Sequence, residues 1–454
     1  MVGLALALCA QDPGSLVERL RAESIDERVI AARRLADLGF PAAPALERAA
    51  ADADPEVAAR ATQLLRSVPS LAPLTGPLLV RAPEGDIPLR AVLAAGGRSA
   101  AFALRRGARS LVVRAAREDR AFEAVDALTL SPDGARDAYV AFDRGEGFVV
   151  VDGETVYEGP GRPSSVTWSP DSRRVAVEIR EDGRSFVLLD GLRGRFFDSV
   201  NEPLFSPDSR HVAYRARDDG REVVVRGDKP GPGYWRMDTP VFSKNGVLAY
   251  AAGPFLDPTL VIGDESRKLD GEYAQQLAFS PDGRRLAYLL YAGGEATLVV
   301  GEERRTVAGT VVGTPLFSPD GAEIAYVAVN GSDWRVLRGE NAGPRFDRIE
   351  WASLRYAPDA KSLAYIATRG DRVMVIAGEA GPEFDRTGPP VWSPDSRRVA
   401  YRAWTPEGAC VVIGHRRTEV FEDVSMPAWS ADGRRVTFGA RRGGDVWLKT
   451  IDVR

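Results

Sequence analysis

The sequence predicts a mainly β fold, a single large β-propeller of about ten four-stranded blades. The first observation is a phrase, an aromatic residue followed by Ser-Pro-Asp, that recurs along most of the chain. The second is its spacing, because successive copies start 36 to 39 residues apart. The third is that each interval holds four short apolar segments, which form a sheet too small to bury both of its faces alone. Sheets repeated around an axis bury those faces against one another, as in a propeller.

The clearest copies of the phrase begin at Phe205, Phe279, Phe317 and Trp392. Counted from the serine or its replacement, the copies start at positions 94, 131, 169, 206, 243, 280, 318, 357, 393 and 430. The copy at position 94 is degenerate, and the copy at position 243 has no aspartate. Ten blades are many for one ring, and eight or nine is the competing count.

Residues 393–430 show how one repeat folds. Pro394 fixes φ in the turn that follows the first strand, and residues 399–403 alternate apolar and polar side chains as a half-buried second strand does. Residues 410–413 are β-branched or apolar and form a third strand, and Val420 begins a fourth. We expect the aromatic residue of each second strand to pack between adjacent sheets.

The last repeat is one strand short. After position 430 the chain has room for strands only at residues 436–440 and 446–453. Residues 78–81 and 87–91 precede the first phrase and could supply the missing strand. We therefore predict that an N-terminal strand closes the ring, which removes an exposed sheet edge.

The chain divides into four segments. Residues 1–11 resemble the end of a secretory signal peptide, residues 12–68 are helical, residues 69–77 are a proline-rich linker, and residues 78–454 form the propeller. A lipidated Cys9 and a plain apolar N-terminus are the alternatives to a cleaved signal. A signal predicts a periplasmic or secreted protein, and no later apolar run is long enough to span a bilayer.

The helical segment carries two capping signals. Ser24 with Glu27 is a capping box, and Asp54 followed by Pro55 is an N-cap with a first-turn proline. The helix after Asp54 resembles the second helix of a HEAT repeat. That resemblance implies a small α-helical interaction module or a plug that packs on the propeller.

Composition excludes several classes of function. The net charge is −4, which gives no electrostatic basis for binding nucleic acid. The two cysteines lie far apart and show no metal-ligand or disulfide spacing. We expect no metal, no cofactor and no membrane-spanning segment, and we expect a monomer.

No residue set demands catalysis. The two histidines, His211 and His415, fall at different positions of distant repeats. The aspartates of the phrase all fall in the same turn, where each is expected to hydrogen-bond its own backbone rather than to bind Ca²⁺, because neighbouring turns are too far apart to converge on one ion. We expect no catalytic residue.

Binding residues are expected among aromatic side chains that depart from the repeat pattern. A protein partner is the first expectation and a carbohydrate the second. The candidates are Tyr234, Trp235, Trp334, Trp351 and Trp404.

The phrase, followed by Ala-Tyr as at Ala287 and Tyr288, resembles the TolB-type, WD-like propeller repeat over about residues 94–454. The resemblance implies a non-catalytic, often periplasmic protein-binding platform. Two alternatives remain: an enzyme, such as a glycoside or peptide hydrolase or a lyase, that uses carboxylates in the channel, and a sensory or regulatory ectodomain.

Overall fold

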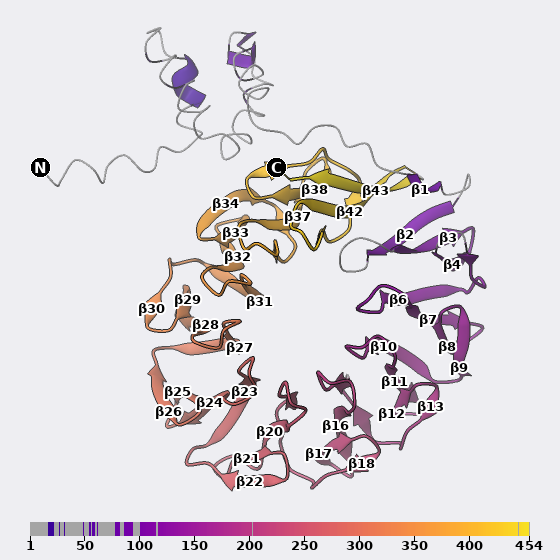
Figure 1. The fold of residues 1–454 in the computed structure, drawn as a ribbon, viewed down its shortest axis with the longest axis vertical. Coiled ribbons are helices and arrows are strands. Elements are labelled where there is room, and N and C mark those ends of the chain that lie inside the picture. Colours follow the sequence, from indigo (N-terminus) through magenta and orange to yellow (C-terminus); the bar gives the residue numbers. More distant parts are fainter. Residues whose placement is uncertain are drawn as a thin grey trace, which may run out of the picture.

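The computed structural model shows a ring of ten blades (Figure 1). It describes residues 78–81, 86–93, 100–114, 117–201, 203–443 and 445–453, with scattered positions between 17 and 61. Each blade is an antiparallel sheet of four strands, and in blades 4, 9 and 10 the first strand consists of two segments that both pair with the second strand. The prediction of a mainly β propeller with about ten four-stranded blades is confirmed.

Blades 1 to 5 follow the chain in order, and in each the first strand lies nearest the centre (Figure 1). Blade 1 contains β2 (Asp86–Leu93), β3 (Ala100–Arg106), β4 (Arg109–Arg114) and β5 (Arg117–Glu118). Blade 2 contains β6 (Ala124–Leu130), β7 (Asp137–Asp143), β8 (Glu146–Val151) and β9 (Glu154–Gly159). Blade 3 contains β10 (Arg162–Trp168), β11 (Val175–Glu181), β12 (Arg184–Leu189) and β13 (Leu192–Arg193). Blade 4 contains β14 (Ser199–Val200), β15 (Leu204–Phe205), β16 (Val212–Asp218), β17 (Arg221–Arg226) and β18 (Lys229–Pro230). Blade 5 contains β19 (Val241–Phe242), β20 (Leu248–Ala252), β21 (Thr259–Ile262) and β22 (Glu265–Lys268).

Blades 6 to 10 continue the ring. Blade 6 contains β23 (Tyr273–Phe279), β24 (Leu286–Ala292), β25 (Glu295–Val300) and β26 (Glu303–Val307). Blade 7 contains β27 (Thr310–Phe317), β28 (Ile324–Asn330), β29 (Asp333–Arg338) and β30 (Asn341–Ala342). Blade 8 contains β31 (Arg348–Tyr356), β32 (Leu363–Arg369), β33 (Arg372–Ala377) and β34 (Glu379–Phe384). Blade 9 contains β35 (Arg386–Thr387), β36 (Val391–Trp392), β37 (Val399–Thr405), β38 (Gly408–Ile413) and β39 (Arg416–Arg417). Blade 10 contains β40 (Asp423–Val424), β41 (Ala428–Trp429), β42 (Arg435–Arg442), β43 (Asp445–Asp452) and β1 (Leu78–Arg81).

The N-terminal strand closes the ring. β1 pairs antiparallel with β43, and Val80 is the Cα partner of Val446. Val446 is buried and belongs to the apolar cluster of blade 1, which includes Leu104 and Leu111. The predicted closure is therefore confirmed, and it is the segment 78–81 that supplies the strand. Residues 87–91 lie within β2, the first strand of blade 1.

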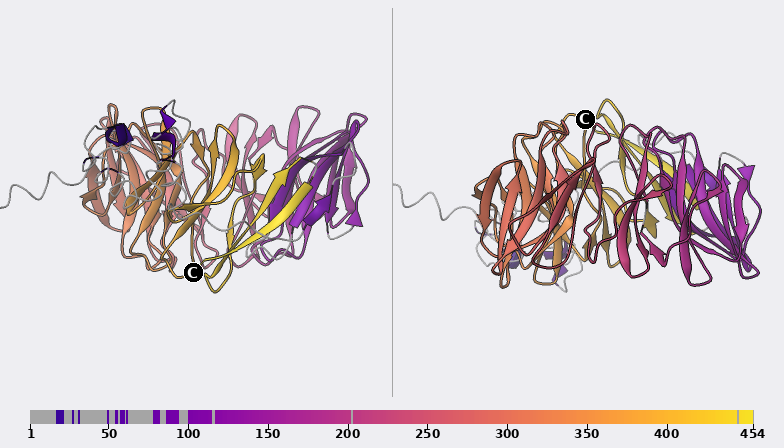
Figure 2. Two further views of the ribbon diagram at one scale, coloured as in Figure 1. Left: turned by 90° about the horizontal axis from the view of Figure 1, so that it is seen from above. Right: turned by 90° about the horizontal axis from the view of Figure 1, so that it is seen from below.

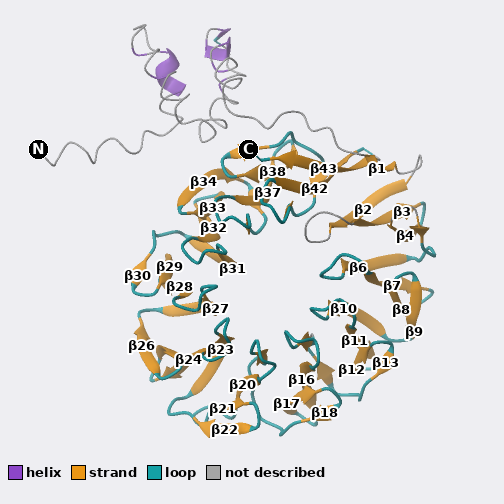
Figure 3. Ribbon diagram, viewed as in Figure 1, coloured by secondary structure: helices purple, strands orange, loops and turns teal. Residues whose placement is uncertain are grey.

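Turns project from both faces of the ring (Figure 2). Strands joined by short turns make up the ring (Figure 3). Because the strands of a blade alternate in direction, the turns after strands 1 and 3 lie on one face and those after strand 2 lie on the other. We call the first the Ser-Asp face, since it carries the repeated turns, and the second the opposite face.

The repeated turn is held by a buried serine. Ser280 Oγ donates a hydrogen bond to Asp282 Oδ1 (2.5 Å) and accepts one from the Arg285 N–H (2.9 Å). The same serine–aspartate bond occurs in the turns that begin at Ser131, Ser169, Ser206, Ser318, Ser393 and Ser430. The phrase therefore fixes the connection between the first and second strands of a blade.

Some turns are also joined to the next blade. The Asp133 N–H donates to Ser172 Oγ (3.0 Å), and the Asp171 N–H donates to Ser209 Oγ (3.0 Å). In both pairs the acceptor is the residue that follows the aspartate in the next turn along the chain. These bonds connect neighbouring turns along the Ser-Asp face.

The hydrophobic core lies between blades rather than within them. One cluster joins Ala101 and Val112 of blade 1 to Tyr139 and Phe148 of blade 2. An edge-to-face aromatic pair recurs at these junctions, for example Phe122 with Tyr139 at 6.2 Å and 75°. The prediction that second-strand aromatics pack between sheets is confirmed for the buried side chains of Phe102, Tyr139, Tyr214, Tyr250, Tyr288, Tyr326, Tyr365, Tyr401 and Phe438.

Only scattered positions of the N-terminal segment are described. They include a 3₁₀ turn at Arg19–Arg21, and Asp54 Oδ1 accepts a bond from the Val57 N–H (3.4 Å), as predicted for an N-cap. Leu20 and Val57 are buried and belong to the same apolar cluster as the core of blade 9. The predicted signal-like segment 1–11 and linker 69–77, and most of the predicted HEAT-like segment 12–68, lie outside the described residues.

No helix in the part of the chain that the structure describes is long and apolar enough to cross a membrane.

Replacement of Ser280 by alanine tests the role of the turn. The variant loses both bonds of a side chain that is 2% exposed, so we expect the free energy of unfolding to fall by about 1–3 kcal/mol. Chemical denaturation of the full chain measures the change. Ser199→Ala on an exposed strand position is the control, and an equal effect of both variants would show that the turn is not the cause.

Candidate binding surfaces

The aspartates of the repeated turns serve their own turns. The serine hydroxyl, followed by a backbone N–H two residues on, lowers the pKa of Asp282 below its ordinary value of 3.8. The pKa is lowered in the same way, with the serine bond as the largest cause, for Asp133, Asp171, Asp208, Asp320, Asp395 and Asp432. The predicted bonding of these aspartates within their own turns is confirmed.

Two of the predicted binding aromatics have packing roles. Tyr234 forms an isolated bridge with Glu222 and meets Tyr250 at 6.3 Å and 71°. Tyr234 thereby occupies the place that Phe197 takes in the preceding junction. Trp334 on β29 is half-buried against the core between blades 7 and 8. We expected both residues to depart from the repeat. Tyr234 does not depart from it, because this tyrosine stands where the pattern has a phenylalanine.

Trp404 and Trp351 lie in other parts of the ring. Trp404, near the end of β37, is half-buried and is covered by the Arg386 guanidinium at 3.7 Å from the ring centroid. Trp351 on β31 is 44% exposed and lines a groove of about 610 Å³ together with Lys244 and Arg355. The Trp351 ring lies against Gly313, where an added Cβ would come within 2.2 Å of it.

Trp235 is the most exposed of the five candidates, at 65%. The guanidinium of Arg221 lies 3.6 Å from its ring centroid. The next residue, Arg236, lies over the ring of Tyr273 at 5.0 Å. Tyr273 stacks on Tyr291 at 4.5 Å with an interplanar angle of 8°.

Two exposed apolar residues extend this group. Phe255 and Leu256 are 56% and 67% exposed, and Phe255 lies 6.1 Å from Tyr273. Both come from the turn between β20 and β21, which is on the opposite face. We call the group of Trp235, Phe255, Leu256, Tyr273 and Tyr291 the aromatic surface.

The turn that carries Phe255 has an unusual backbone. Leu256 has φ of +72°, a left-handed conformation that a leucine rarely adopts. Its N–H donates to the Glu272 carbonyl of the next blade (2.8 Å), which holds the turn in place. A strained backbone that presents an exposed leucine is typical of a binding loop.

A small cleft of about 50 Å³ lies beside the aromatic surface. Arg236, Asp238, Phe255 and Tyr273 line it. Asp238 accepts a hydrogen bond from the Gln276 N–H across the junction of blades 5 and 6. The cleft is large enough for the tip of one side chain and too small for a cofactor.

The structure does not gather the five predicted aromatics into one site. Tyr234 and Trp235 lie at blades 4 and 5, Trp334 at blade 7, Trp351 at blade 8 and Trp404 at blade 9. The aromatic surface therefore contains only Trp235 of the predicted set. The signal that could have revealed Phe255 and Leu256 is the longer turn at residues 253–258, since the equivalent turn of blade 4 is the short Asp219-Gly220.

The histidines lie on opposite sides of the ring. His211 occupies the last position of a repeated turn, where its N–H donates to Ser206 Oγ (2.9 Å). His415 is exposed on the turn between β38 and β39 and lines a cavity at the junction of blades 8 and 9. Among the residues that the structure describes, no group of three or more His, Cys, Asp or Glu side chains is placed to hold a metal ion.

No family model and no curated protein matches this chain. Solved structures that resemble it include a eukaryotic initiation factor, with 12% identity, 77% of this chain and 93% of that chain covered, and a TM-score of 0.43. The Dos1 propeller has 12% identity, covers 64% and 92%, and has a TM-score of 0.37. TolB from Acinetobacter baumannii has 15% identity, covers 64% and 79%, and has a TM-score of 0.30. Likeness at this level carries no argument about function.

The lowered pKa values predict how stability depends on pH. A carboxyl whose folded pKa is below its unfolded value stabilises the fold above the unfolded pKa, and this contribution is lost as pH falls towards the folded pKa. We therefore expect the Tm to be nearly constant from pH 7 to 5 and to fall below about pH 4. The difference in Tm between the wild type and Asp282→Asn should shrink at pH 3, as thermal scans can show. A difference that stays the same at pH 3 and pH 7 would contradict the role given to this carboxylate.

Proposed function

We propose that this protein is a non-catalytic propeller scaffold that binds a protein partner through the aromatic surface of blades 4 to 6. The observation that carries the proposal is the grouping of exposed Trp235, Phe255 and Leu256 with the stacked pair of Tyr273 and Tyr291. Tryptophan, tyrosine and arginine are the residues in which interface energy concentrates.

The arginines of the aromatic surface support this role. Arg221 and Arg236 lie over the rings of Trp235 and Tyr273. This contact holds both rings in place before a partner arrives, so little side-chain entropy is lost on binding. The same guanidinium groups extend a polar rim around the apolar centre, as in other protein interfaces.

The shape favours a protein over a carbohydrate. Leu256 projects from a turn, and the adjacent cleft of about 50 Å³ is too small for a sugar ring with its hydroxyls. A protein partner could place one side chain in the cleft and cover Leu256 with an apolar patch. Recognition of this kind requires no reaction at the surface.

We also propose, from the apolar residues 2–10, that the scaffold acts in the periplasm or as a secreted protein. The HEAT-like segment would then be a second contact area or a docking arm. Neither the enzyme nor the sensory alternative has a particular observation in its favour.

Replacement of both Trp235 and Phe255 by alanine should weaken partner binding at least about 100-fold, because two exposed anchors are removed. The partner is identified by affinity capture with the full chain, and its dissociation constant is then measured for each variant. The Tm should stay within about 2 °C of the wild type, since neither side chain is buried.

The matched control is Leu192→Ala. Leu192 is 75% exposed but lies on blade 3, outside the aromatic surface. Its removal should leave the affinity unchanged. Undiminished binding by the Trp235→Ala, Phe255→Ala variant would show that the partner contacts another part of the ring.

A further inference from the structure

Arginines fill the gap between blades at several junctions of the Ser-Asp face. Arg136 and Arg174, each the last residue of a repeated turn, lie over the first-strand aromatics Trp168 (5.1 Å) and Phe205 (5.6 Å) of the next blade. Arg285 lies in the same way over Phe317 at 5.5 Å.

A second position also supplies such an arginine. Arg338, at the end of β29, lies over Tyr356 of blade 8 at 5.7 Å. Its Nη2 donates to the Ala360 carbonyl (3.0 Å) in the repeated turn of that blade. The junction of blades 7 and 8 is therefore closed by a side chain from the third strand.

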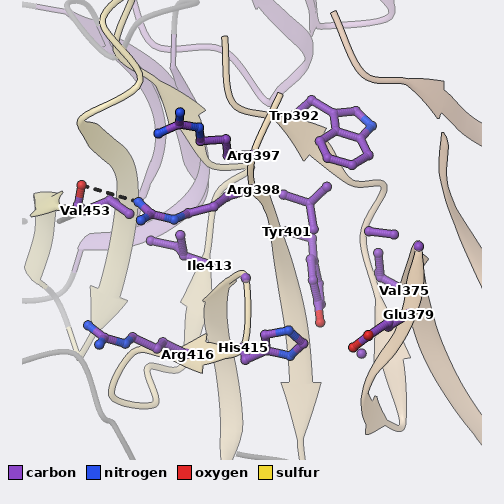
Figure 4. A pocket seen from close by; sticks show the side chains of 15 residues that line it. Val375, Glu379, Trp392, Arg397, Arg398, Tyr401, Ile413, His415, Arg416 and Val453 are labelled. Carbon is purple, nitrogen blue, oxygen red and sulfur yellow. Dashed lines mark hydrogen bonds between the residues drawn. The ribbon is translucent and has the colours of Figure 1, made fainter. Parts of the chain in front are cut away.

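In blade 8, a small residue stands both at the end of the repeated turn and at the end of the third strand, the two positions from which an arginine reaches the next blade elsewhere. Ser362 ends its repeated turn, since its carbonyl accepts from the Ala357 N–H as the Arg174 carbonyl accepts from Ser169. Ala377 pairs with Ala364 in the register in which Arg338 pairs with Ala325. No arginine of blade 8 closes the junction with blade 9, and a cavity of about 590 Å³ lies there (Figure 4).

The cavity contains a buried hydroxyl without a partner. Tyr401 is 1% exposed, and its Oη makes no hydrogen bond within the described residues. Figure 4 shows the hydroxyl directed towards the end of the cavity where His415 and Glu379 lie. A buried hydroxyl without a partner has lost its hydrogen bonds to water and has gained none within the protein. An oxygen atom of a ligand would restore the missing hydrogen bond.

In blade 2 the equivalent hydroxyl has a partner. In blade 2, Tyr139 donates to Asp119 Oδ2 (3.1 Å), and Asp119 lies three residues before Phe122. The residue three before Phe384 in blade 8 is Gly381, which has no side chain to accept from Tyr401. An added Cβ at Gly381 would lie 3.1 Å from this hydroxyl. Glycine also stands at this position before Phe197, Tyr234 and Phe346, so Asp119 is the exception. Among the second-strand tyrosines that the structure describes, only Tyr401 has a hydroxyl that is both buried and without a partner.

The charge at the cavity favours an anion. Arg397, Arg416 and His415 are exposed at its rim, and Arg398 also lines it, where its Nη1 donates to the Val453 carbonyl (3.5 Å). Glu379 is the one acidic residue among those that line the cavity. The three arginines outnumber this carboxylate and favour an anionic ligand. Glu379 lies at the end of the cavity towards which the Tyr401 hydroxyl points, where it disfavours a second negative charge.

The walls are apolar. Val399 and Ile413 are buried, and the indole of Trp392 lies at the end of the cavity away from Arg416 and His415 (Figure 4). A volume of about 590 Å³ is within the range of small-molecule sites. The cavity thus combines a cationic rim, a buried hydroxyl and flat apolar walls.

We propose that the junction of blades 8 and 9 binds a small organic monoanion, a carboxylate attached to a flat apolar body. Tyr401 donates a hydrogen bond to the carboxylate, Arg416 and His415 face it, and the apolar body lies between Trp392 and the buried Val399 and Ile413. Burial raises the pKa of Tyr401, so its hydroxyl stays protonated and remains a donor. This site lies on the Ser-Asp face and is separate from the proposed protein-binding surface.

Isothermal titration with 2-naphthoate, 2-naphthamide and 2-naphthyl phosphate tests the proposal on the full chain. We expect saturable binding of one naphthoate per chain, at least about tenfold weaker binding of the neutral amide, and weaker binding of the phosphate, which Glu379 repels. Glu379→Gln should bring the phosphate closer to the carboxylate in affinity.

Two variants locate the binding. Ala377→Arg introduces the arginine that closes the preceding junction, and we expect it to abolish binding. Tyr401→Phe should weaken naphthoate about tenfold while leaving the Tm of the free protein unchanged or raised, because no bond is lost. Tyr365→Phe, the equivalent change in blade 8, is the control and should leave the affinity unchanged.

Three results would each overturn the proposal. One is the absence of saturable naphthoate binding at millimolar concentration. Another is equal binding by the wild type and Ala377→Arg. The last is equal affinity for the acid and the amide, which would show that the cavity takes apolar molecules without regard to charge.

Discussion

The bond between a serine hydroxyl and an aspartate carboxylate, which recurs in seven of the repeated turns, is the interaction on which the ring depends. At Ser393 it joins the hydroxyl to Asp395 Oδ1 (2.6 Å), and the same hydroxyl accepts the Arg398 N–H (3.0 Å). One side chain thereby fixes both ends of the turn from the first to the second strand. Because the serine is buried, water cannot replace these bonds. A fixed turn sets the position of the second-strand aromatic, and that aromatic packs the junction.

The repeating part of the structure could be predicted from the sequence because each of its rules is local. The turn, the strand pattern and the missing strand of blade 10 depend on residues close together in the chain. Even so, Tyr234 looked unlike the repeat only because a tyrosine stands where Phe197 stands one blade earlier. In the sequence, this replacement of phenylalanine by tyrosine looked like a departure from the repeat, although the tyrosine packs in the same place.

The candidate sites could not be predicted in this way, because they arise between blades. The aromatic surface joins Trp235 to Tyr273 through Arg236, across residues that are distant in sequence. The cavity beside Tyr401 depends on residues of blade 8 that are small, Ala377 and Gly381. Only a comparison of structurally equivalent positions shows that an arginine, Arg338, occupies the place of Ala377 one blade earlier. Function at this ring is therefore expected where the repeat omits a side chain or lengthens a turn.

The most direct test of the account concerns the closure of ten blades by β1. Val80 and Val446 are Cα partners of an antiparallel pair, at a separation that suits a disulfide. Val80→Cys with Val446→Cys, in a chain whose Cys9 and Cys410 are replaced by serine, should oxidise to a disulfide within one chain. Peptide mapping by mass spectrometry under non-reducing conditions would detect the linked peptides, and the Tm should rise on oxidation. A bond between two chains, or no bond at all, would contradict the closed ring.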